Sequence, residues 1–143
     1  MESIMKKFIS VIALSIASFA SQAASVSFPE SIEVLAVNGL SNVDSRYLEL
    51  DQGQNLIEVQ YRDLFETNAE DSNWVRSEPL YLYIDLETTA NYKAFTPNIV
   101  SEEDAYLFID NPTIKLNDGM GSEKQVSLMT HGQLMTKLLL SKQ

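Results

Sequence analysis

The sequence predicts a mainly β fold of the α+β class, a single antiparallel β-sandwich-like domain with two helices. Apolar and polar side chains alternate with a period of two over many short runs, as in strands with one buried face. Turn-forming pairs and prolines separate these runs. Helix-start patterns occur only twice, and they predict one short helix near 101–110 and a C-terminal helix near 131–141. No repeat, linker or low-complexity tract divides the chain, so residues 24–143 are expected to form one domain.

The first 23 residues are predicted to be a secretory signal peptide. Lys6 and Lys7 supply the positive start, an apolar run over residues 8–19 follows, and small residues precede Ala23. We expect cleavage after Ala23, with a cut after Ala24 as the alternative. The chain has no cysteine for lipid attachment, and no later apolar run approaches the roughly 20 residues of a membrane helix. The prediction is therefore a periplasmic protein without stable membrane insertion after signal cleavage.

The composition is strongly acidic, with a formal net charge of −10. Loss of residues 1–23 removes one acid and two lysines, which changes this charge to −11. Nucleic-acid binding depends on clustered lysines and arginines that neutralise phosphates, so the composition argues against that class of partner. Acidity commonly serves solubility, and it leaves a basic partner or calcium open.

The first half of the domain is predicted to hold three strands and a loop. Ile32–Val37 is an apolar run that ends at the turn pair Asn38-Gly39. Tyr47–Leu50 and Asn55–Tyr61 alternate apolar and polar side chains. Residues 66–76 are polar and acidic apart from one tryptophan, and this composition predicts a loop.

The second half is predicted to begin with a central strand, Leu80–Leu86. Its leucines and isoleucine point one way and Tyr81 and Tyr83 the other, so both faces are expected to be covered. The other expected strands are Asn91–Phe95, Thr113–Leu116 and Gln125–Leu128.

Each predicted helix has an N-terminal capping signal. Ser101 precedes three acidic residues, which the positive end of a helix dipole favours, and Asn111-Pro112 ends this helix. Thr130 and Gln133 have the spacing of a capping box at the start of the C-terminal helix.

Few side chains in this chain are suited to catalysis. His131 is the only histidine and is expected to be an exposed first-turn side chain, and neither cysteine nor G-x-S-x-G is present. Zinc would need a cluster of histidine or cysteine. The acids at 63–71 and 102–104 lack the spacing of a calcium loop. We therefore expect a non-enzyme with no catalytic residue, no cofactor and no metal.

Aromatic side chains on strands are the remaining candidates for partner binding. Tyr81, Tyr83 and Trp74, with Tyr61 as a further candidate, could form a platform for a sugar or a peptide. Aromatic residues on strands more often belong to the core, and this alternative stays open.

The segments IEVLAVNG, LELDQGQNLIEVQY, SEPLYLYIDL and SEEDAYLFIDNPTIKLNDG occur in this order between Phe28 and Leu128. Their succession resembles the curli synthesis inhibitor (YccT-like) family of exported gammaproteobacterial proteins, formerly a domain of unknown function. The resemblance implies a non-enzymatic periplasmic protein that restrains assembly of the amyloid fibre called curli, with a fibre subunit as its protein partner. Members are often longer, so it also implies a C-terminal segment beyond Gln143.

A second reading is an envelope structural domain or a carbohydrate- or peptide-binding accessory domain. The pattern L-x-L-x-x-G-x-x-x-I-x-V from Leu48 to Val59 resembles small envelope-associated β modules of the PEGA type.

The reading as a curli synthesis inhibitor has a plausible physical route. A soluble sheet protein could cover the exposed edge of an amyloid subunit by adding one of its own strands to that edge. Tyr47–Leu50 and Thr113–Leu116 are short enough to be such edges.

Overall fold

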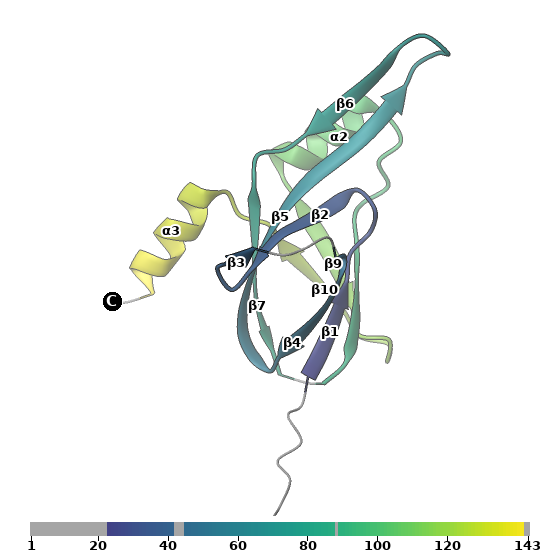
Figure 1. Cartoon of the computed structure of the whole chain (residues 1–143). Helices are drawn as coiled ribbons and strands as arrows, with labels where there is room; N and C mark the ends of the chain where they lie inside the picture. The colour runs from purple at the N-terminus through teal and green to yellow at the C-terminus, as the bar shows by residue number, and fades with distance from the viewer. Residues whose placement is uncertain (1–22, 42–44, 88, 142–143) are drawn as a thin grey trace, which may run out of the picture.

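The computed structural model describes residues 23–41, 45–87 and 89–141, and they form two five-stranded sheets with two helices (Figure 1). This confirms the mainly β, sandwich-like α+β fold. The predicted signal peptide lies outside the described residues except for Ala23, the first residue of strand β1.

The first sheet has the strand order β10-β9-β8-β1-β4. One pairing differs from the antiparallel prediction, because β1 runs parallel to β8 while its pairing with β4 is antiparallel. The strands are β1 (Ala23–Ser27), β4 (Tyr47–Asp51), β8 (Asn91–Phe95), β9 (Thr113–Asn117) and β10 (Glu123–Ser127).

The second sheet is built on the long strand β5. It has the order β3-β2-β5-β6, and β7 also pairs with β5. β6 pairs with residues 62–66 and β7 with residues 53–59, so these two strands follow one another along β5. The bounds are β2 (Ile32–Val37), β3 (Leu40–Ser41), β5 (Gly53–Glu66), β6 (Ser72–Arg76) and β7 (Leu80–Leu86).

Both helices occur where the sequence predicts them. Helix α2 (Glu102–Asp110) has Ser101 as its N-cap, whose hydroxyl accepts the N–H of Asp104. Helix α3 (His131–Leu140) begins with the expected capping box of Thr130 and Gln133. α2 covers one face of the β5–β6 hairpin, whereas α3 projects beside β7 (Figure 1).

The core lies between the sheets and continues under α2. Tyr61 is fully buried, and its ring centroid lies 5.1 Å from that of Phe108 on α2. The predicted turn at Asn38-Gly39 is confirmed, because both residues have positive φ, and Val37 pairs directly with Leu40 across it.

The predicted loop over residues 66–76 is wrong. β5 continues to Glu66, and β6 begins at Ser72, so only a five-residue connection remains. The side-chain oxygen of Asn68 accepts the N–H groups of Glu70 and Asp71 and closes this turn. β6 is polar because Val75 is its one buried residue, and a single buried position gives no alternating signal.

Two predictions of strand position are also wrong. β7 is not central, because it pairs with one strand, β5. Apart from that pairing, the described residues give β7 only an isolated bridge from Tyr81 to Met129. Its second face is covered by α3, which explains the apolar appearance of both faces. Thr113–Leu116 is not an edge, because β9 lies between β8 and β10; the other predicted edge, Tyr47–Leu50, is one.

Candidate functional site: the Trp74 groove

All three arginines of this acidic chain lie around its single tryptophan. Arg46 and Arg62 line a groove of about 570 Å³ together with Trp74, and Arg76 reaches over the same indole ring. We call this site the Trp74 groove. One wall is the outer face of the β5–β6 hairpin, and the other holds Glu30 and residues 33–35 of β2.

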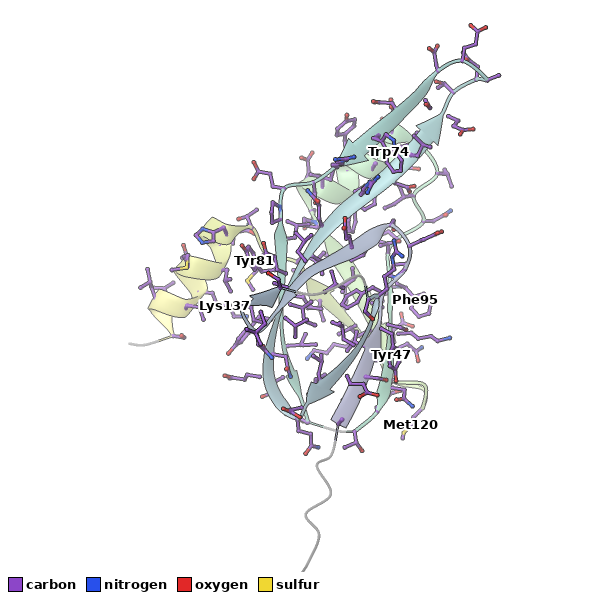
Figure 2. The ribbon with its side chains drawn as sticks, in the orientation of Figure 1. Tyr47, Trp74, Tyr81, Phe95, Met120 and Lys137 are labelled. Atoms are coloured by element: carbon purple, nitrogen blue, oxygen red, sulfur yellow. The ribbon has the colours of Figure 1, made fainter. Side chains whose placement is uncertain are left out.

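Strand pairing places these side chains on one face of the hairpin. Leu64 lies opposite Trp74 and Arg62 opposite Arg76, so all four side chains share a face. The alternate face carries Val75, which is buried with the core under α2. Burial of that face leaves Trp74 pointing outward, with 48% of its surface exposed, on the projecting hairpin in Figure 2.

The two arginines hold their guanidinium groups near the indole ring. The central guanidinium carbon lies 4.3 Å from the ring centroid for Arg62 and 5.9 Å for Arg76, both within cation–π range. Among the described residues, a single ion pair is present, between Lys115 and Glu123 at 3.5 Å. Neither Arg62 nor Arg76 therefore has an ion-pair partner in this part of the chain. The N–H donors of a guanidinium group that lies over an aromatic ring remain in the guanidinium plane. They can therefore donate to a planar acceptor such as a carboxylate.

The backbone of β6 presents an open edge beside the groove. Ser77 donates its N–H to the carbonyl of Tyr61, and Thr67 donates to Asp71. The alternation of an antiparallel ladder then directs the backbone groups of Asn73 and Val75 toward β5. The N–H and C=O groups of Ser72, Trp74 and Arg76 therefore face away from the sheet.

The edge of the first sheet at β4 is more protected. Ser45 uses its hydroxyl to bind both the N–H and the carbonyl of Tyr47, at 3.2 and 2.6 Å. The amide of Asn55 donates to the carbonyl of Asp51 at 2.9 Å. Local side chains thus satisfy both outward backbone groups of Tyr47 and the outward carbonyl of Asp51, which makes the two ends of β4 poorer acceptors for another strand.

The structure places Tyr81 and Tyr83 away from Trp74. Their partners on β5 are Glu58 and Leu56, whereas Trp74 lies opposite Leu64. Figure 2 shows Trp74 on the hairpin and Tyr81 beside α3. Of the aromatic residues considered from the sequence, Trp74 is the one in the groove. Tyr81, Tyr83 and Trp74 therefore do not form one platform.

Contacts with α3 occupy both tyrosines. The ring of Tyr81 lies 6.0 Å from that of His131, and the ammonium of Lys137 lies 5.4 Å from the ring of Tyr83. Burial, followed by the nearby Glu58 carboxylate, raises the pKa of the Tyr81 hydroxyl. Tyr61 is buried in the core, where burial and then the Asp63 carboxylate raise its pKa.

The described residues contain no cluster of three or more histidine, cysteine, aspartate or glutamate side chains arranged to hold a metal ion. His131 is exposed at the first position of α3, as its sequence position indicates. Over the same residues, neither helix has the length and apolar character needed to cross a membrane.

No local pattern in the sequence groups the arginines of the groove. Arg46, Arg62 and Arg76 are widely separated in the chain, and only the β5–β6 pairing and the fold of residues 45–46 bring them together. Arg46 directly precedes and Arg62 directly follows a predicted strand, whereas Arg76 falls at the end of the predicted loop, so these positions do not indicate a shared site.

Comparison with known proteins identifies one family. The family model described as "Uncharacterized protein conserved in bacteria (DUF2057)" matches residues 25–140, which include every described strand and helix apart from the first two residues of β1. Searches of curated proteins and of solved structures gave no match.

Proposed function

The chain belongs to this family of uncharacterized conserved bacterial proteins (DUF2057), and we propose that it is a non-enzymatic periplasmic protein that binds and restrains an assembling fibre subunit. The subunit would be of the amyloid type found in curli, as implied by the resemblance of the sequence to the curli synthesis inhibitor family. The observation that carries the proposal is the open β6 edge, which projects from the body next to an exposed tryptophan.

Strand addition gives this edge a physical role. An amyloid subunit grows by pairing its backbone groups with those of the next chain. A subunit segment that pairs with Ser72, Trp74 and Arg76 would have one of its edges occupied by a folded protein. That edge could then no longer pair with another subunit. The net charge of −11 expected after loss of residues 1–23 would also oppose close association of two such complexes.

Other edges give the proposal less support. On β4, Ser45 binds both outward backbone groups of Tyr47, and Asn55 binds the carbonyl of Asp51. β10 carries Glu123 and Lys124, and charged side chains of this kind blunt an edge against pairing. β6 combines free backbone groups with a large aromatic side chain, a residue type enriched at binding hot spots.

The proposed location follows from the signal-like residues 1–23. Ala24 is 1% exposed and pairs with Leu50 within the first sheet. A cut after Ala23 keeps this buried residue in the domain, whereas a cut after Ala24 removes it. The structural role of Ala24 therefore favours the first of the two cleavage sites considered from the sequence.

The test is the lag time of fibre formation by a purified curli-type subunit in the presence of the mature chain. At equimolar or lower ratio the chain should lengthen the lag. Ser72→Pro removes an outward N–H without removing a bond to β5, and it should weaken the effect; Ser72→Ala is the matched control. An unchanged lag at excess wild-type chain would refute the proposed function.

A further inference from the structure

We propose that the Trp74 groove binds a carboxylate side chain of an extended acidic segment, which the guanidinium groups of Arg62 and Arg76 hold beside the indole ring. This inference rests on the proposed strand addition at β6 and specifies the chemistry of the partner. It is carried by the joint position of an open strand edge and two arginines without an ion-pair partner among the described residues.

The geometry of strand addition delivers a side chain to this place. A strand paired with β6 would point every second side chain to the outer face, about 7 Å apart along the strand. The side chain opposite Trp74 would lie beside the indole ring, within the same face as Arg62 and Arg76. One carboxylate at that position could reach a guanidinium group while the backbone pairs with β6.

The guanidinium groups favour a carboxylate over an amide. Arginine presents a planar set of donors that matches the two oxygens of a carboxylate, and such charge-assisted bonds are stronger than neutral ones. Trp74 holds the Arg62 guanidinium at 4.3 Å, so less side-chain freedom remains to be lost on binding. The indole ring thus acts as a support for the arginine as well as a contact for the partner.

The charge of the rest of the protein restricts where an acidic segment can dock. The chain has twice as many acidic as basic residues, so most of its surface repels such a segment. Glu30 and Glu33 on the β2 wall would likewise repel a carboxylate on that side of the groove. The third acid of the lining, Asp63 on β5, has its carboxylate oxygens engaged by the N–H of Leu64 and the hydroxyl of Tyr61. The segment would therefore be directed to the arginines on the hairpin wall, which gives both position and orientation.

The experiment uses the fluorescence of Trp74, the single tryptophan. The mature chain is titrated with two acetylated and amidated heptapeptides, Thr-Glu-Thr-Glu-Thr-Glu-Thr and its counterpart with glutamine at each glutamate. The peptides have the same length and shape and differ in the carboxylates. The glutamate peptide should bind at least about tenfold more tightly, as expected for charge-assisted bonds. Equal affinities of the two peptides for the wild type would overturn the carboxylate site but would leave strand addition standing. Binding of neither peptide would also overturn the carboxylate site.

Variants separate the arginine site from general charge effects. Arg62→Gln and Arg76→Gln should each reduce the preference for the glutamate peptide, and Arg62→Lys should retain part of it. Glu33→Gln should increase the affinity for that peptide, and a decrease would point to a cationic ligand and contradict the proposal. Lys137→Gln is the matched control, because it removes an equal charge at the cation–π contact between α3 and Tyr83 of β7. Its effect should be much smaller than that of Arg62→Gln.

A second copy of the chain is the competing occupant of the β6 edge. Sedimentation at the concentrations of the titration measures it directly. A monomer supports the assignment to a partner segment. A dimer that is lost on Arg76→Gln and excludes the glutamate peptide would overturn it.

Discussion

The central guanidinium carbon of Arg62 lies 4.3 Å from the ring centroid of Trp74 on the neighbouring strand. The pairing of β5 with β6 creates this contact, and the burial of Val75 on the opposite face keeps it at the surface. A cation that stacks on an exposed ring, with no carboxylate partner among the described residues, is available to a ligand.

Removal of this contact should be visible in the emission of Trp74. Arg62→Ala exposes one face of the indole ring to water, so the emission should move to longer wavelength. An exposed cation–π contact contributes about 0.5–1 kcal/mol, so the free energy of unfolding should fall by no more than that. Arg46→Ala is the control, because Arg46 lines the same groove and donates to the backbone of Glu30. An unchanged spectrum for Arg62→Ala would contradict the stacked arrangement.

Asn55 should be a main polar determinant of stability at the turn between β2 and β3. Its side chain is 3% exposed, donates to the carbonyls of Asp51 and Gly53, and accepts a bond from Asn38 at 3.1 Å. Asn55→Ala leaves these partners without a bond, and the free energy of unfolding should fall by about 1–3 kcal/mol in urea denaturation. Gln54→Ala at the exposed neighbouring position should change it by less than about 0.5 kcal/mol.

Tyr61 should make stability fall at alkaline pH. Burial and then the Asp63 carboxylate raise its pKa in the folded protein above the usual value of about 10. Below pH 10 both states keep the proton, so this group adds no pH dependence. Above pH 10 the unfolded chain loses the proton while the folded chain retains it, so the free energy of unfolding should fall by up to about 1.4 kcal/mol per pH unit.

The comparison of two variants isolates this effect. Tyr61→Phe should make the decline above pH 10 shallower, because the group that titrates differently in the two states is gone. Tyr106→Phe, at an exposed position of α2, should keep the wild-type decline. Identical slopes for wild type and Tyr61→Phe would show that another group is responsible.

The mature protein should begin at Ala24. Mass spectrometry of the chain isolated from the periplasm of an expressing bacterium gives the cleavage site directly. A chain that begins at Ser25 would have lost the residue that pairs with Leu50, and a chain that retains residue 1 would contradict export by signal cleavage.

Much of the fold could be predicted because most strands have one buried face. The alternation from Asn55 to Tyr61, the turn at Asn38-Gly39 and the caps of both helices are local patterns with local physical causes. The sequence did not predict the strand at 72–76, because only Val75 of this strand is buried. It also did not predict that β7 lies beside one strand, since α3 covers its second face in place of a neighbouring layer.

The candidate site was predicted in part. Trp74 was proposed as a binding residue, but its arginine neighbours depend on the register of β5 with β6, which no local pattern specifies. Tyr81 and Tyr83 were proposed from the alternation of their strand, and the same alternation turns them toward α3. An outward-facing aromatic residue can contact either solvent or another element of the same chain, and the sequence of the strand does not distinguish these outcomes.

The central claim is that an extended partner pairs with the edge of β6. Residue-resolved hydrogen exchange of the labelled chain, mixed with a curli-type subunit during its lag phase, tests this directly. The backbone N–H groups of Ser72, Trp74 and Arg76 should exchange more slowly in the mixture, while those of Glu49 on β4 and Gln125 on β10 remain unchanged. Protection confined to β4 or β10, or none on any edge, would contradict the account.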